Sequence, residues 1–132
     1  MSSAEGSSKF LVISKGQWDE DKSPEQIQAA IDAFYKWHDV LVAQGKMISG
    51  QRLQPAKMVV SKHGVIDGPF AETKEVIGGY WHFVANSLEE AAALGAQCPT
   101  LGFGLSLEIR PIEPKTCSAY DRTTETPQSW KK

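Results

Sequence analysis

The chain has 132 residues, which suits one domain with a single core and is too short for two. Its formal net charge of −2 at pH 7 provides no positive field for nucleic acid or anionic lipid, so we expect neither partner. No stretch approaches the roughly 20 apolar residues of a membrane span, and the first residues lack the basic and apolar segments of a secretory signal. With only two cysteines and no CxxC spacing, the sequence predicts a cytoplasmic protein without a disulfide scaffold.

Composition divides the chain into three regions. Residues 9–112 carry the apolar patterns of a compact domain. Residues 1–8 are small and polar, and we expect a disordered leader there. Residues 113–132 are rich in Thr, Ser, Pro and charge, which indicates an irregular C-terminal tail.

The domain begins with a predicted strand and a long predicted helix. Lys9–Ser14 is a short apolar run with β-branched residues, typical of a buried strand. Ser23 suits the N-cap of a helix, Pro24 its first position and Gln26 the capping-box partner. Gly45 is predicted to end this helix.

The rest of the domain reads as five strands and a second, shorter helix. Glycines interrupt two of these strands: we expect a break or a bulge at Gly50, and a bulge or a close backbone approach at Gly78-Gly79. In chain order the predicted elements are strand Lys46–Leu53, a hairpin of Lys57–Ser61 with Val65-Ile66, strand Val76–Ala85, helix Leu88–Gln97 and strand Leu105–Ile109.

This order predicts an α+β domain of the ferredoxin-like βαββαβ type with an added β-hairpin, in which two helices lie on one face of an antiparallel sheet. Along one strand, Trp81 and Phe83 point to one face while Tyr80 and His82 point to the other. Which of these faces lies beneath the helices stays open at this point. Both carry large side chains, so we expect a homodimer in which a second copy covers the remaining face.

The segment between the hairpin and the strand that follows it is distinctive. Residues 67–75 read DGPFAETKE. Together with other short matches, this segment resembles the DGPF-type branch of the YCII-related proteins. The resemblance runs from the first strand to Arg110-Pro111, and the other matches are Gly45, Ser49-Gly50, Leu53-Gln54-Pro55, Gly78-Gly79 and Cys98-Pro99.

The resemblance implies a ferredoxin-like fold that dimerises as an α/β barrel, with a small pocket whose chemistry is unassigned for most members. A few YCII-type members are thought to use a His and an Asp in acid–base chemistry. The position of that histidine in the family falls on Phe34 of this chain, and His38 lies one helical turn later as its counterpart.

Asp67 has two interpretations. As the first residue of an Asp-Gly-Pro run, its carboxylate can accept backbone N–H bonds and hold a turn. Alternatively, it faces the pocket as a general base, which would require burial to raise its pKa. The two roles are compatible, because strained turns often carry site residues.

His38 belongs to the apolar stripe of the first helix, so we expect its side chain to point at the sheet. It is either a buried neutral imidazole with a hydrogen-bond partner, a catalytic or ligand-binding group, or a metal ligand. The three histidines of the chain show no HxH or HxxxH spacing, and we expect neither a metal nor a cofactor.

Two functions from different classes follow from these residues. One is a small cofactor-free enzyme, in which Asp67 and His38 move a proton on a small ring-type metabolite. The other is a non-catalytic module that binds a small molecule or acts as a regulatory accessory. In either case the candidate substrate-binding residues are Tyr80, Trp81, His82, Arg110 and Ser49.

Overall fold

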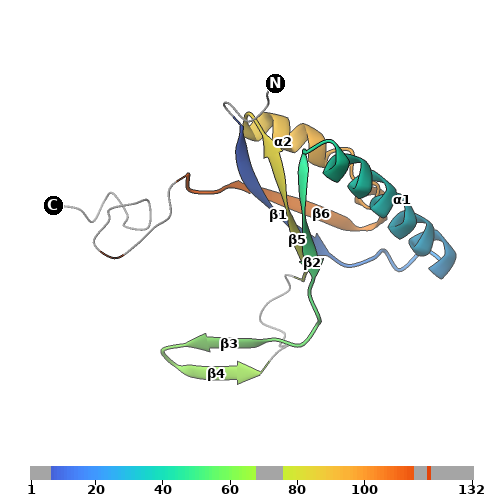
Figure 1. Cartoon of the computed structure of the whole chain (residues 1–132). Coiled ribbons are helices and arrows are strands. Elements are labelled where there is room, and N and C mark those ends of the chain that lie inside the picture. Colours follow the sequence, from blue (N-terminus) through green and yellow to red (C-terminus); the bar gives the residue numbers. More distant parts are fainter. Residues whose placement is uncertain (1–6, 68–75, 115–118, 120–132) are drawn as a thin grey trace.

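The computed structural model describes residues 7–67, 76–114 and 119 of the chain. Figure 1 shows a sheet with helices packed against it and a hairpin standing apart. In chain order the elements are β1 (Ser8–Gly16), α1 (Pro24–Ala43), β2 (Met47–Arg52), β3 (Met58–Ser61), β4 (Gly64–Asp67), β5 (Ile77–Ala85), α2 (Leu88–Gly95), the 3-10 turn η1 (Leu101–Phe103) and β6 (Leu105–Pro111).

The main sheet is antiparallel and has the strand order β2-β5-β1-β6. Both helices lie on the same side of it (Figure 1). The predicted mixed α+β architecture is therefore confirmed, and the strand order is consistent with a ferredoxin-like fold. Between α2 and β6 the chain forms the single turn η1.

Helix α1 begins where the sequence predicted. The Ser23 hydroxyl accepts a hydrogen bond from the Gln26 backbone N–H at 3.1 Å, and the Gln26 side chain accepts one from the Ser23 N–H at 2.8 Å. This capping box satisfies two backbone donors that the helix start would otherwise leave without partners. Neither α1 nor any other helix in the described ranges is long and apolar enough to cross a membrane.

Replacing Ser23 with alanine is expected to lower the free energy of unfolding by about 1 kcal/mol, because the cap hydroxyl is lost. Urea denaturation followed by circular dichroism measures this change. Ser106→Ala, at an exposed position of β6, is the matched control and is expected to have little effect. Equal stability of Ser23→Ala and wild type would show that the cap contributes nothing.

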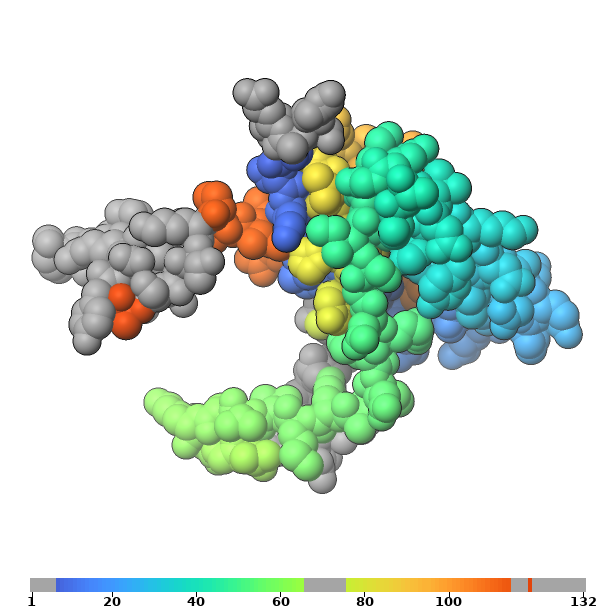
Figure 2. Space-filling view, viewed as in Figure 1, coloured from blue at the N-terminus to red at the C-terminus, as the bar shows by residue number. Residues whose placement is uncertain are grey.

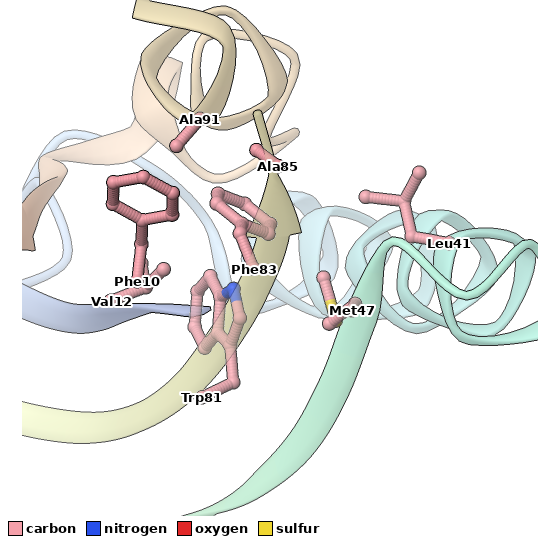
Figure 3. Close-up of a cluster of buried hydrophobic side chains, with 8 residues drawn as sticks. All are labelled: Phe10, Val12, Leu41, Met47, Trp81, Phe83, Ala85 and Ala91. Carbon is pink, nitrogen blue, oxygen red and sulfur yellow. The ribbon is translucent and has the colours of Figure 1, made fainter. Parts of the chain in front are cut away.

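The core lies between the helices and the sheet (Figure 3). Phe83 and Val12 are fully buried, and they pack with six other buried side chains and several half-buried ones from both helices. Aromatic rings dominate one end: Trp37 and Trp81 each meet Phe83 edge-on, with ring centroids 6.1 and 6.2 Å away. The buried members are Phe10, Val12, Leu41, Met47, Trp81, Phe83, Ala85 and Ala91.

The opposite face of the sheet, which we call the open face, has no helix over it within the described part of the chain (Figure 1). Strand pairing places Leu11 beside His82 and Ile13 beside Tyr80 on this face, and Ile48 lies next to His82. Ile48 is 41% exposed and Tyr80 37%. The structure thus answers the question that alternation left open: Trp81 and Phe83 lie beneath the helices, while Tyr80 and His82 do not.

The open face has a charged border on β6. Lys15 donates a hydrogen bond to Glu108 at 2.9 Å, and Arg110 lies 4.0 Å from the other Glu108 oxygen. The Lys15 hydrogen bond and charge, with a smaller contribution from Arg110, hold the pKa of Glu108 below its ordinary value. The interactions of ionised Glu108 with Lys15 and Arg110 therefore stabilise the fold at pH values above the ordinary glutamate pKa. This stabilisation is lost as acidification protonates the Glu108 carboxylate.

The predicted hairpin is confirmed as β3 and β4, which pair only with each other among the described strands. It projects away from the body of the molecule (Figure 2). Its apolar side chains are exposed: Val60 by 73%, Met58 by 67% and Val65 by 62%. The hairpin therefore adds an unusual amount of uncovered apolar surface.

Candidate functional site

His38 lies on the sheet side of α1, as its apolar stripe predicted, and its side chain is only 16% exposed. Its Nε2 atom lies 3.0 Å from the Ser49 hydroxyl on β2, and its Nδ1 atom lies 2.9 Å from a carboxylate oxygen of Asp39. A carboxylate only accepts hydrogen bonds, so the network assigns the ring proton to Nδ1. The lone pair of Nε2 then faces the Ser49 hydroxyl.

Ser49 faces α1 because it lies two residues after the buried Met47, on the same face of β2, and the strand becomes irregular just beyond it. The β2–β5 register shifts between Ile48 and Gln51, as the sequence predicted from Gly50. A Cβ atom at position 50 would overlap the carbonyl oxygen of Tyr80, so only glycine allows β5 to approach this closely. The bulge instead turns Arg52, whose backbone pairs with Gly79, to the helix side of the sheet.

Gly50→Ala is expected to lower the free energy of unfolding by at least about 2 kcal/mol, because the added methyl group meets rigid backbone. Thermal unfolding measures the loss. Gly102→Ala is the matched control, since a Cβ at that position meets nothing within 4 Å. Comparable stability of the two variants would show that the bulge does not need glycine.

Two adjoining cavities open beside His38, with volumes of about 100 and 230 Å³. We call them together the helix-side cleft. The smaller one contains His38 and Ser49, and the larger one extends between the first half of α1 and the sheet toward Trp18 and Thr100. The residues that line both cavities are Ser14, Phe34, Tyr35, Arg52 and Trp81.

Aromatic rings form much of the cleft wall. Phe34 lies 5.2 Å from Trp81 and 5.0 Å from Tyr35 between ring centroids. Trp81 is itself 6% exposed and packs into the core through Phe83. A wall anchored in this way is rigid, which favours binding of a flat molecule.

The structure separates the predicted site residues into two groups. His38, Ser49 and Trp81 line the helix-side cleft, and Tyr80 borders it from β5. His82 and Arg110 lie on the open face, where Arg110 neighbours Glu108. They therefore do not join His38.

Asp67 is the last residue of β4, and its backbone pairs with Met58. Its side chain lies outside the described part of the chain, as do residues 68–75 of the DGPFAETKE segment. The two sequence interpretations of Asp67 therefore both stay predictions.

Asp39 and Arg52 both bear on this site, and neither was predicted as a site residue from the sequence. Asp39 contacts the ring of its neighbour His38 although its own side chain is 78% exposed. Arg52 lies two positions beyond the Gly50 bulge and lines both cavities. The bulge itself was the available signal, since it shifts the alternation of β2 and turns the following residues.

The family model of the YCII-related domain matches residues 9–114. No curated protein matches the chain. The match does not distinguish branches of the family, so the DGPF-type assignment stays a prediction.

Proposed function

The chain belongs to the YCII-related family, and from the helix-side cleft we propose that it is a small cofactor-free enzyme that performs acid–base chemistry on a small ring-type metabolite. The observation that carries the proposal is the Asp39–His38–Ser49 chain of hydrogen bonds beside an aromatic cavity. In this arrangement His38 moves the proton.

The geometry supports a specific division of roles. Asp39 accepts the Nδ1–H bond and so keeps the Nε2 lone pair directed toward Ser49 and the smaller cavity. A substrate that displaces the Ser49 hydroxyl, or binds beside it, presents its own acidic C–H or O–H to the Nε2 atom of His38. His38 takes this proton and returns it to another atom of the same molecule, so the reaction is an isomerisation that needs no oxidant or reductant.

Asp67 is part of the same proposal as a second acid–base group. The family resemblance supports it, and its strand ends where the DGPFAETKE segment begins. The test is Asp67→Asn: we expect a loss of turnover with unchanged stability. A loss of stability with unchanged turnover per folded molecule would assign Asp67 to the turn alone.

Solvent exchange tests the proposed chemistry even when the product is unknown. The wild-type protein is incubated in D₂O with a library of single-ring unsaturated lactones, enols and carboxylates, and mass spectrometry records deuterium incorporation. We expect at least one compound to exchange far faster than in buffer. Compounds that bind saturably without exchange or conversion would contradict the enzyme proposal and support the non-catalytic binding module.

We also propose that two copies pair through the open face and thereby form a dimeric α/β barrel. The exposed apolar residues of the sheet and of the hairpin support this pairing. In a dimer with two-fold symmetry, the apolar surface of each copy would be covered by the same surface of the other copy. The barrel implied by the family resemblance agrees with it.

Ile13→Glu is expected to convert the dimer to a monomer, because it places a charge at the centre of the open face between Tyr80 and Glu108. Light scattering at micromolar concentration measures the mass, and twice the 14.5 kDa of the chain is expected for wild type. Val40→Glu, at a 53% exposed position of α1, is the control and stays dimeric. A wild-type mass near 14.5 kDa would rule out the pairing.

A further inference from the structure

The helix-side cleft has a single permanent charge. Among the described residues that line either cavity, Arg52 alone is always ionised, and none is Asp, Glu or Lys. The guanidinium of Arg52 also makes no ion pair or hydrogen bond with any residue in the ranges 7–67 and 76–114. Arg52 is an exposed residue, so its five N–H donors are hydrated and can transfer to a bound molecule.

Arg52 occupies a defined place relative to the other cleft groups. Its backbone pairs with that of Gly79 at the end of β2, and it borders both cavities. Phe34, Tyr35 and Trp81 border both cavities as well, while His38 and Ser49 border the smaller one. A molecule held by Arg52 would therefore lie along the aromatic wall and reach His38 at its other end.

We propose that the cleft binds a planar carboxylate of single-ring size, with its carboxylate on Arg52 and its ring against Trp81 and Phe34. The planar guanidinium matches a carboxylate with two parallel N–H···O bonds. Together the two cavities reach only the low end of the roughly 300–1,000 Å³ of typical ligand pockets, which favours a ligand of about one ring. This inference rests on the proposed function, since it names the substrate class for His38.

Benzoate and its uncharged isostere benzamide are the probes. Calorimetric titration of the wild-type protein is expected to give saturable benzoate binding at least about 10-fold tighter than benzamide binding, because only benzoate offers a charge to Arg52. Arg52→Gln is expected to weaken benzoate binding by about 10- to 100-fold and to leave benzamide binding nearly unchanged. Arg52→Lys keeps the positive charge but not the paired N–H donors of the guanidinium. Its benzoate affinity is therefore expected to lie between those of the wild type and Arg52→Gln.

Arg110→Gln is the matched control, since it removes an arginine from the open face, and it is expected to bind benzoate as wild type does. Equal affinity for benzoate and benzamide, or benzoate affinity unaltered in Arg52→Gln, would overturn the inference. Absence of saturable benzoate binding would do the same.

The His38→Gln variant separates this inference from the proposed function. Benzoate affinity within about threefold of wild type is expected, because Arg52 and the aromatic wall remain intact. If Arg52 governs binding while no compound exchanges deuterium, the anion site stands and the proposed enzyme activity fails. If exchange occurs but is equally fast in Arg52→Gln at low substrate concentration, the activity stands and the anion site fails.

Discussion

His38→Gln is expected to slow deuterium exchange of any turned-over compound by about 100-fold or more, because general acid–base catalysis contributes roughly 10²- to 10⁴-fold. Glutamine retains a polar side chain that can hydrogen-bond Ser49, so the helix and its contact with β2 should persist. The measurement is the initial exchange rate at saturating substrate, with folding checked by circular dichroism.

His82→Gln is the matched control for this loss, because it removes a histidine from the open face and leaves the cleft unchanged. It is expected to retain the wild-type exchange rate. Should both variants lose activity equally, the reaction would depend on the open face or on the intact assembly, and His38 would have no special role.

The neighbours of His38 are expected to matter less than His38 itself. Asp39→Asn should reduce the rate by less than about fivefold, since Asp39 is 78% exposed and a hydrogen bond that competes with water contributes about 1 kcal/mol or less. Ser49→Ala distinguishes two roles of the hydroxyl. A modest change in the exchange rate fits direct proton transfer to His38. A complete loss of exchange would instead make Ser49 the nucleophile and contradict the proposed isomerisation.

Phe83→Ala is expected to lower the free energy of unfolding by about 3–5 kcal/mol, the largest stability effect among the variants proposed for this chain. Phe83 is fully buried and contacts both Trp37 and Trp81, so its removal leaves a cavity that rigid rings cannot fill (Figure 3). Chemical denaturation measures the loss, and Phe83→Leu should lose markedly less because it keeps most of the apolar volume.

A control for Phe83→Ala comes from the same strand. Val84→Ala removes a half-buried side chain from the open face and is expected to cost about 1 kcal/mol. Similar losses for the two variants would mean that the core is not concentrated beneath the helices. Because Trp81 packs on Phe83 and also lines the cleft, Phe83→Ala is also expected to weaken ligand binding.

Local signals predicted most of the fold. The Ser23 capping box and the glycine at position 45 bracket α1 in the structure as they did in the sequence, because both act through neighbouring backbone groups. The irregularities at Gly50 and beside Gly78-Gly79 were predicted from glycine alone, and at Gly50 a side chain would prevent the backbone approach. The predicted end of α2 was less accurate, as the helix ends at Gly95.

The candidate site was only partly predictable. The stripe of α1 was enough to direct His38 toward the sheet. That Ser49 is its partner depends on where α1 packs across β2, which no local pattern specifies. The place of Arg52 in the cleft was equally unpredictable, because it depends on which side of the sheet α1 covers.

Strand alternation also explains why Tyr80, His82 and Arg110 were grouped with His38 in the sequence. Alternation shows which residues share a face, but not which face the helices occupy. In the structure Trp81 and Phe83 take the helix side, which moves His82 and Arg110 to the open face. That face is where a second copy is proposed to bind.

The proposed enzyme activity and the proposed anion site both require a ligand site in the helix-side cleft and not on the open face. An amide-resolved NMR titration of the ¹⁵N-labelled wild-type protein with benzoate decides between the two locations. We expect saturable shifts at Tyr35, His38 and Arg52, with Leu11 and Arg110 unmoved. Shifts concentrated at Leu11 and Arg110, with Tyr35, His38 and Arg52 unmoved, would place the ligand on the open face and contradict the cleft site.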